Sequence, residues 1–518
     1  MLVNHSVCVP HVTKIPRIME VHLQKPNESR RSRTMQILLG FITNLSNLAP
    51  GITLGFSAIL LPVLTAPGPE NISMDQGSWI ASTASITMPI GCLISGPILD
   101  KFGRKMALYI VNVLSLLGWI FIAGASYDVA WMYVMLLIGR AVTGIATGMG
   151  SIPATVYLSE ISTPKLRAML ATWTSVFIAI GVLIIYVLGL FLKESWRVSA
   201  RITVAIPAIA LVAIYFLMPE SPQWLVGRKR IQEAEHSLAR IWRVDVSSPY
   251  VKDEIEKLLL ASTKSKSTKT DQKTALAKVK SKVKYFLRPG CIKPFVIMVS
   301  YFFFQQFAGT FVIVFYAVQI VENTGVQIDP YLSAVIIGVS RVVASFLVGP
   351  ICKRYGRRPP SIISGATMSI SMICLAGYLY AVHLGTISSD TAKSINWLPV
   401  LLIILYFFTS TLGFLTIPFA MIAEMYPTKV RGLAGGMTAC FCYVFNFITV
   451  KTYPQMVASM NEHGVYGFYG AVSLVGTLFV VLCLPETKGK TLQEIEDYFN
   501  SGRTKVDERT ALNNGSRV

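Results

Sequence analysis

Oppositely charged side chains recur at matching places in the two halves of this 518-residue chain. A glycine followed by two basic residues occurs at Gly103-Arg104-Lys105 and again at Gly356-Arg357-Arg358. Downstream of each, a glutamate precedes a proline and an arginine: Glu160 in the first half and Glu424 in the second. Partly exposed ion pairs are individually weak and break easily. The pattern therefore favours reversible electrostatic contacts.

Polar side chains also interrupt long apolar stretches, most clearly at Gln305, Gln306 and Tyr316. Gln305 and Tyr316 are eleven residues apart, about three helical turns, which predicts that they share one helix face. Ala308-Gly309 lies between them and can loosen the helix there. Amide side chains both donate and accept hydrogen bonds, which suits a polar ligand. They also join neighbouring membrane helices, and both interpretations stay open.

The elements that position these residues are membrane spans. The chain is 53% hydrophobic and 14% charged, whereas a soluble domain carries roughly 25% charged residues. The apolar residues fall in blocks of about 20, the length of a transmembrane helix, and the bilayer core leaves helix as their only conformation. We predict an all-α membrane protein with twelve transmembrane helices at residues 35–64, 78–99, 106–126, 130–157, 168–192, 198–218, 293–321, 331–352, 360–383, 396–423, 431–458 and 464–484.

The spans divide into two groups of six. We expect an N-terminal tail (1–34), a first bundle (35–218), a cytoplasmic linker with short amphipathic helices (219–292), a second bundle (293–484) and a C-terminal tail (485–518). The net charge of +20 comes mainly from loops on one side of the membrane. The positive-inside rule explains this charge without a nucleic-acid partner and predicts that both termini are cytoplasmic.

The first loop on the opposite side contains Asn71-Ile72-Ser73, a predicted N-glycosylation site. We take the plasma membrane as the default location.

Further motifs accompany the two glycine-basic loops in chain order. They are Pro219-Glu220-Ser221-Pro222-Gln223, Gln305-Gln306-Phe307-Ala308-Gly309-Thr310-Phe311 and Pro485-Glu486-Thr487-Lys488-Gly489. Together the five motifs resemble the sugar-porter family of the major facilitator superfamily, in particular the facilitated trehalose transporters of insects. The resemblance covers about residues 35–495 and implies two pseudo-symmetric six-helix bundles that carry a sugar across the membrane.

In that setting the charged loops suit a cytoplasmic gate. We expect Glu160 to pair with Arg431, and Glu424 with Arg167, across the two halves. The alternative is that these charges only enforce topology. Lys353 stands where the family usually has an acid, which puts in doubt the local pairing of the second loop. The supporting residues of the predicted gate are Asp100, Arg104, Arg357, Arg358, Glu220 and Glu486.

By the resemblance, Gln305 and Gln306 bind the sugar. Ser175, Phe311 and Phe419 replace an amide, an asparagine and a tryptophan of the family pattern, so the pocket is less polar than a hexose site. It could suit a larger sugar, a glycoside or a non-sugar. The remaining predicted binding residues are Tyr316, Asn446 and Arg341.

Arg341 is the odd member of this set, because the facilitative glucose transporters carry asparagine there. It either binds an anionic or polyhydroxyl substrate, or it contacts backbone carbonyls or snorkels.

Proton-coupled relatives carry an aspartate in the first span, facing an arginine of the fourth. Here the stretch reads Gly55-Phe56-Ser57, while Arg140 remains. We therefore predict facilitated diffusion (uniport) by alternating access. The alternatives are a proton-coupled or anion-handling porter of the same fold, and a sugar sensor that does not transport.

The sequence contains no recognisable catalytic triad, metal-ligand cluster or phosphate loop. We expect neither an enzyme nor a cofactor or metal site, and a monomer should suffice because the fold encloses its own pathway.

Overall fold

The computed structural model describes residues 29–193, 195–267, 286, 288–387, 395, 397–427, 430–490 and 492–501. All regular elements in these ranges are helices, which confirms the predicted all-α class. The middle of the predicted linker and the ends of both predicted tails lie outside the described residues.

Eleven helical stretches in the described part are long and apolar enough to cross a membrane. Three of them are each built from two helices in succession. The stretches are α1 (Arg30–Leu45) with α2 (Leu48–Thr65), α3 (Met74–Phe102), α4 (Arg104–Ala123), α5 (Val129–Ile161), α6 (Pro164–Leu192), α7 (Trp196–Leu217), α12 (Pro289–Phe307) with α13 (Thr310–Asn323), α14 (Pro330–Tyr355), α15 (Arg358–His383), α17 (Leu398–Leu412) with α18 (Ile417–Met425), and α19 (Arg431–Cys483).

The last stretch accounts for two of the twelve predicted spans. With 53 residues, α19 would be about 80 Å long if straight, far more than the ~30 Å apolar thickness of a bilayer. Asn461 interrupts it with a left-handed φ of 56°. The chain turns there, so α19 contains an outgoing and a returning span.

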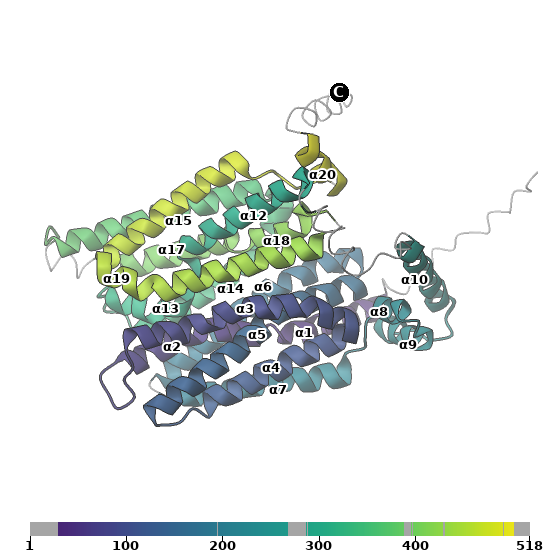
Figure 1. Ribbon diagram of the computed structural model, residues 1–518, viewed down its shortest axis with the longest axis horizontal. Helices are drawn as coiled ribbons and strands as arrows, with labels where there is room; N and C mark the ends of the chain where they lie inside the picture. Colours follow the sequence, from purple (N-terminus) through teal and green to yellow (C-terminus); the bar gives the residue numbers. More distant parts are fainter. Residues whose placement is uncertain are drawn as a thin grey trace, which may run out of the picture.

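The helices form two bundles that lie side by side (Figure 1). α1 to α7 make up the first bundle and α12 to α19 the second. The bundles meet mainly where α6 packs on α14, α3 on α19 and α2 on α13. These paired helices form the seam along which any substrate path between the halves must run.

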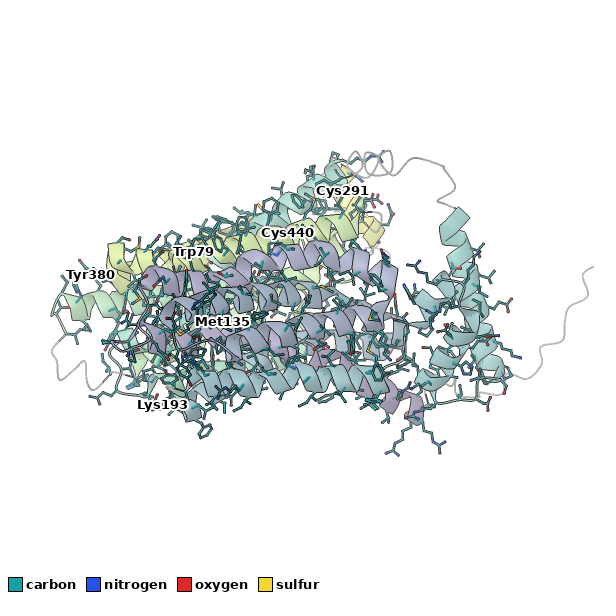
Figure 2. All side chains as sticks on the ribbon, turned by 60° about the horizontal axis from the view of Figure 1, so that its bottom comes forward. Trp79, Met135, Lys193, Cys291, Tyr380 and Cys440 are labelled. Atoms are coloured by element: carbon teal, nitrogen blue, oxygen red, sulfur yellow. The ribbon has the colours of Figure 1, made fainter. Side chains whose placement is uncertain are left out.

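Three short helices, α8 (Pro222–Gly227), α9 (Ile231–Trp242) and α10 (Pro249–Ser267), lie beyond one end of the bundles, and α20 (Leu492–Ser501) packs on α12 at the same end. We call this the linker end. α9 buries Ala234, Leu238 and Ile241, as the predicted amphipathic pattern requires. Figure 2 shows Lys193 and Tyr380 at the opposite end, which we call the distal end.

Glycine allows helices of the first bundle to approach closely. A Cβ added to Gly91 of α3 would lie 2.1 Å from the carbonyl oxygen of Ile145 on α5, and one added to Gly148 would lie 2.0 Å from that of Met88. Within a membrane the hydrophobic effect does not drive helices together, so they associate through close van der Waals packing, which small residues allow. α3 and α5 are thus held at backbone contact, which fixes the frame for the charged residues at their linker ends.

We expect Gly91→Ala to lower the free energy of unfolding of the detergent-purified protein by about 1–3 kcal/mol, the usual cost of overpacking. The melting temperature should fall accordingly. Gly96→Ala on the same helix is the matched control, because a Cβ there meets nothing within 4 Å. The control gains helix propensity, up to about 1 kcal/mol. Equal melting temperatures for the two variants would contradict the close α3–α5 contact.

Candidate functional site

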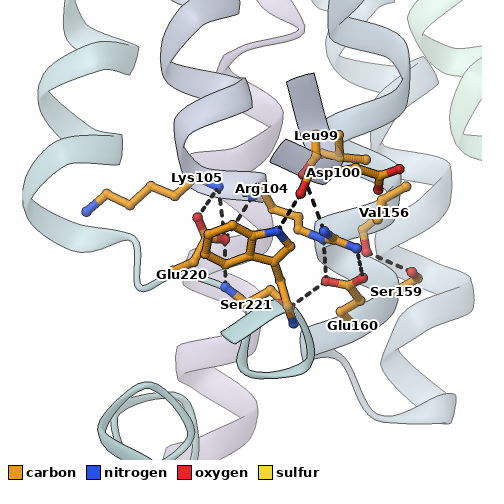
Figure 3. A network of polar contacts seen from close by, with 10 residues as sticks. Leu99, Asp100, Arg104, Lys105, Val156, Ser159, Glu160, Glu220 and Ser221 are labelled. Carbon is orange, nitrogen blue, oxygen red and sulfur yellow. Dashed lines mark hydrogen bonds and ion pairs between the residues drawn. The ribbon is translucent and has the colours of Figure 1, made fainter. Parts of the chain in front are cut away.

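A bidentate ion pair joins α4 to α5 at the linker end of the first bundle. Arg104 donates from Nε to Glu160 Oε2 at 2.8 Å and from Nη2 to Oε1 at 2.6 Å. Ser221 donates its hydroxyl to the same carboxylate. Figure 3 shows these groups converging from three segments. Two parallel charge-assisted bonds give both strength and a fixed orientation.

Glu220 caps the start of α4 in the same network. Its carboxylate accepts the backbone N–H groups of Arg104 at 2.9 Å and Lys105 at 3.1 Å. These N–H groups are otherwise unpaired at a helix N-terminus, where a negative charge is favoured. Gly103 makes the approach possible: it has a φ of 98°, and a Cβ there would lie 2.3 Å from Glu220 Oε2. The sequence Gly-Arg-Lys is therefore a turn that presents two donors to one acid.

The second bundle repeats this arrangement. Arg357 Nη2 donates to Glu424 Oε1 at 2.7 Å, and the Thr487 hydroxyl donates to the other oxygen of Glu424. Glu486 accepts the backbone N–H groups of Arg357 and Arg358, both at 3.0 Å. Gly356, with a φ of 91°, occupies the place of Gly103. The internal repeat seen in the sequence is thus a repeat of side-chain geometry.

The two networks differ in burial and in the number of hydrogen bonds. Arg104 and Glu160 expose 13% and 8% of their side chains, whereas Arg357 and Glu424 expose 23% and 29%. Arg357 Nε is buried without a hydrogen-bond partner among the described residues, so the second pair has one bond fewer. The second network is thus more exposed to solvent and has fewer side-chain hydrogen bonds than the first.

The two capping acids also differ in pKa. Burial raises the pKa of Glu220 above its ordinary value, and the backbone N–H bonds only partly oppose this. Burial acts in the same sense on Glu486, but there the N–H groups of Arg357, Lys488 and Arg358 prevail and hold the pKa below its ordinary value. The protein therefore stabilises the charged form of Glu486 more than that of Glu220.

The predicted ion pairs across the halves are not formed in this structure. Glu160 is held by Arg104 and Glu424 by Arg357, each within its own bundle. Arg431 donates from Nε to the Tyr426 carbonyl oxygen, and Arg167 from Nη2 to that of Ser162, both at 3.3 Å. The left-handed glycine turn brings each loop arginine to the adjacent helix of its own bundle. The pairs across the halves stay a prediction for a conformation that is closed at the linker end.

The remaining predicted gate residues occupy the edges of the networks. The Asp100 side chain is exposed, and its carbonyl oxygen accepts hydrogen bonds from Trp224 and Arg228. Arg228 also donates to the carbonyl oxygen of Lys101, and at the corresponding position of the second bundle Lys488 donates to that of Arg354. Because the backbone serves as the acceptor in both halves, a lysine at 353 leaves the second network intact.

Arg358 bonds the carbonyl oxygen of Val481. This contact ties the start of α15 to the end of α19.

A chain of side-chain hydrogen bonds crosses the middle of the protein. Ser85 on α3 donates to Asn446 on α19, and Asn446 Nδ2 donates to Gln306 Oε1 at 3.1 Å. Gln306 Nε2 in turn donates to Gln305 Oε1 at 3.2 Å. Gln305 Nε2 ends the chain on the carbonyl oxygens of Phe414 and Leu415, at 2.7 and 2.9 Å, between α17 and α18. Three predicted binding residues are thus brought together, and they link the two bundles.

These amides are buried, with Gln305 fully so, and each has protein partners. In this conformation they act as interhelical contacts, one of the two interpretations that the sequence allowed. The predicted loosening at Ala308-Gly309 is confirmed: Gly309 has a φ of 86° and separates α12 from α13. The Ala308 carbonyl oxygen freed there accepts the Tyr406 hydroxyl at 2.6 Å.

The same break separates two predicted binding residues. Tyr316 lies on α13 and donates to the Val450 carbonyl oxygen at 3.1 Å, whereas Gln305 lies on α12 and contacts the α17–α18 junction. The expected shared helix face is wrong, because a left-handed residue interrupts the regular helical rotation between them. The Tyr316 ring packs on Tyr453, with ring centroids 4.7 Å apart.

The other predicted binding residues lie apart from the hydrogen-bonded chain. Phe311 is buried on α13, and Ser175 is half-buried on α6. Phe419 on α18 is 38% exposed and packs edge-on against Phe302.

Sequence reasoning missed a polar cluster at the α1–α2 break, where Asn44 accepts hydrogen bonds from Asn47 and Thr174. The signal was present: Thr43, Asn44, Ser46 and Asn47 stand together inside the first apolar span.

Arg140 is buried in the first bundle and donates four hydrogen bonds to neutral partners. Nε and Nη1 donate to the carbonyl oxygens of Ile80 and Thr53, while Nη2 donates to that of Ala81 and, at 3.0 Å, to the Ser57 hydroxyl. Arg140 thus contacts Ser57, which lies in the stretch where proton-coupled relatives carry the aspartate. No carboxylate pairs with Arg140 among the described residues, so the contact has no titratable acid.

Arg341 presents the opposite case. Its side chain lies between α14, α6 and α17, is 5% exposed, and has its Nη1 buried without a hydrogen-bond partner within the described ranges. The Phe407 ring lies 5.7 Å from Cζ. Neither of the two structural alternatives for Arg341, contact with backbone carbonyls or snorkelling, is seen within the described residues.

The chain matches the family described as "Sugar (and other) transporter" over residues 32–499. The chain belongs to that family. A facilitated trehalose transporter of Apis mellifera ligustica is 30% identical over 486 residues, which cover 93% of this chain and 91% of the relative. A facilitated trehalose transporter of Culex quinquefasciatus is 30% identical over 468 residues, covering 89% and 85%.

Solved structures of the same fold include the xylose transporter XylE of E. coli in an inward-open conformation. It has a TM-score of 0.71 and 22% identity and covers 89% of this chain and 99% of its own. XylE as a proton:xylose symporter bound to 6-bromo-6-deoxy-D-glucose has a TM-score of 0.70 and 21% identity, covering 90% and 100%. For this sugar-transporter family member they establish the fold, and the fold by itself leaves the coupling ion open.

We expect Glu486→Gln to destabilise the protein at pH 7 more than Glu220→Gln. The lowered pKa of Glu486 means that its charge adds stability above the unfolded-state pKa, near 4.5. The raised pKa of Glu220 means that its charge costs stability there, so neutral glutamine is better tolerated. Thermal unfolding in detergent measures both.

The loss of stability of Glu486→Gln relative to the wild type should shrink as pH falls through the pKa of Glu486, below about 4.5. The wild type then loses the same charge. A larger deficit for Glu220→Gln at pH 7 would contradict the assignment.

Proposed function

We propose that this family member is a facilitative transporter (uniporter) of a sugar, a hexose or a trehalose-like disaccharide, working by alternating access. The sugar class is supported by relatives named as facilitated trehalose transporters that align over about nine-tenths of the chain. The observation that carries the uniport mechanism is the contact between Arg140 and the Ser57 hydroxyl. A proton carrier in a membrane span needs an ionisable acid, and serine supplies none.

The central hydrogen-bonded chain is the proposed sugar site. Gln305, Gln306 and Asn446 offer donors and acceptors where the bundles meet, and transporters of this class bind substrate at the interface of their repeats. Sugar hydroxyls can take over the bonds that the amides now make with each other. Tyr316, Phe311, Ser175 and Phe419 would line the path on either side, and Phe311 and Phe419 supply apolar surface that suits a larger sugar.

The charged networks are the proposed cytoplasmic gate. At the linker end each acid pairs within its own bundle, whereas at the distal end ion pairs join the bundles. Lys193 on the first bundle lies 2.6 Å from Asp329 on the second, and Lys451 on the second lies 2.5 Å from Asp75 on the first. This asymmetry supports an inward-facing arrangement, closed at the distal end.

The linker end is the proposed cytoplasmic side of a plasma-membrane protein that functions as a monomer. Its basic residues support this side under the positive-inside rule. Asn71 lies exposed in the distal loop between α2 and α3, the proposed glycosylation site.

Uptake into proteoliposomes containing the purified full chain tests the proposed function. We expect saturable uptake of labelled trehalose or glucose that ends at equal concentrations and is unchanged by an imposed pH gradient. Accumulation above equilibrium that a protonophore abolishes would select a proton-coupled porter instead. Sugar binding without flux would select a sensor.

The distal ion pairs should hold the halves closed on that side. Each surface pair contributes roughly 0.2–1 kcal/mol, so Lys193→Gln combined with Lys451→Gln should speed amide exchange at the distal ends of α3 and α14 a few-fold. Hydrogen–deuterium exchange with mass spectrometry measures this.

Lys257→Gln is the matched control, because it breaks an exposed pair with Asp253 within α10. Unchanged exchange in the double variant would show that the two pairs do not hold the distal end closed.

A further inference from the structure

Arg341 carries a buried positive charge that the protein does not neutralise. No carboxylate pairs with it among the described residues, Nη1 has no acceptor, and the nearby ring of Phe407 supplies only a weak cation–π contact. An uncompensated buried ion costs several kcal/mol even after relaxation. Arg140, also buried, shows the ordinary solution in this fold: four hydrogen bonds to oxygen atoms. Arg341 lacks that solution.

Arg341 lies near mid-membrane where the two bundles meet. It is the twelfth residue of α14, a helix of 26 residues, so it lies near mid-membrane at 1.5 Å per residue. Tyr186 of the first bundle lies close by: its ring is in contact distance of a Cβ on Gly338, one turn from Arg341. The Tyr186 hydroxyl crosses to the Val314 carbonyl oxygen of the second bundle at 2.8 Å. Arg341 therefore lies on the seam between the bundles.

A second unused polar group shares this face of α14. Ser345, one turn further toward the linker end, has a buried hydroxyl without a hydrogen-bond partner within the described residues. Residues four apart on a helix lie one above the other. The guanidinium and the hydroxyl therefore offer hydrogen-bond donors one turn apart on the same face of α14. Neither Arg341 Nη1 nor the Ser345 hydroxyl has a partner among the described residues.

The N–H donors of Arg341 determine which chemical group suits this site. A guanidinium has five N–H donors and no acceptor, and its planar fork matches a carboxylate with two parallel bonds. A neutral hydroxyl would accept one bond but leave the charge unbalanced. One carboxylate balances one guanidinium, whereas a doubly charged phosphate would leave a buried negative charge.

We propose that Arg341 binds the carboxylate of a polyhydroxylated organic monoanion, a sugar acid, so that the substrate range extends beyond neutral sugars. The inference rests on the proposed function for the hydroxyl-binding part of the site. Gln305, Gln306 and Asn446 bind the hydroxyl groups, and Arg341 with Ser345 binds the acid end. Binding neutralises the seam at mid-membrane, and transport of such a substrate moves net charge.

Equilibrium binding to the purified full chain in detergent tests this without requiring transport. Glucuronate and glucose are the probes, because they differ only in a carboxylate in place of a hydroxymethyl group. We expect glucuronate to bind at least about tenfold more tightly, equivalent to about 1.4 kcal/mol, and Arg341→Asn to remove this preference. Arg341→Lys should retain part of it, since lysine keeps the charge but not the fork.

Thermal unfolding separates this role from a structural one. Removing an uncompensated charge should leave Arg341→Asn at least as stable as the wild type without ligand, whereas a structural role predicts a loss. Glucuronate should raise the melting temperature of the wild type and not that of Arg341→Asn. Arg201→Gln, which removes an exposed arginine from α7, is the control for loss of charge and should behave like the wild type.

Equal affinity for glucuronate and glucose in the wild type, or a preference that survives in Arg341→Asn, would overturn the inference. Neither result bears on sugar uptake by the wild type, so the proposed transport function would stand. Conversely, absence of uptake for every sugar with an intact glucuronate preference would overturn the proposed transport function and keep the Arg341 site.

Discussion

The bilayer core offers no hydrogen-bond partner, so every polar group placed there must find one within the protein. Most of the structure is a response to this constraint. Arg140 is surrounded by carbonyl oxygens and one hydroxyl, the breaks at Gly309 and between α17 and α18 have their carbonyl oxygens bonded by Tyr406 and Gln305, and the central amides bond each other. A substrate competes with these internal partners, which suits a transporter because the site must release as readily as it binds.

The linker end obeys a second requirement, that helices of one bundle stay joined while the bundles move. In each half an arginine, two glutamates and a hydroxyl residue tie three segments together, and a left-handed glycine brings them into contact. Because the ties lie within bundles, they permit rocking as rigid bodies. The first network is more buried and has one more hydrogen bond than the second, although their sequences repeat.

The sequence predicted the fold almost completely, because hydropathy and basic loops follow directly from the membrane environment. It also identified the residues of both charged networks, since their motifs repeat. It did not predict which acid each arginine pairs with in this structure. A turn with positive φ at Gly103 or Gly356 brings the arginine to the adjacent helix of its own bundle, and such a turn cannot be inferred from residue spacing. The polar run at the α1–α2 break was visible in the sequence, but its contact with Thr174 was not. The unsatisfied Arg341 likewise depends on three-dimensional neighbours, such as Tyr186, that lie far away in the chain.

Alternating access is the central claim, and a distance across the linker end tests it most directly. Spin labels at Ser159→Cys on α5 and Gly432→Cys on α19, both exposed, report the separation of the bundles by double electron–electron resonance in a background without other reactive cysteines. We predict two distance populations, with the weights changed by saturating trehalose, glucose or glucuronate. A single distance that none of these ligands alters would contradict the account.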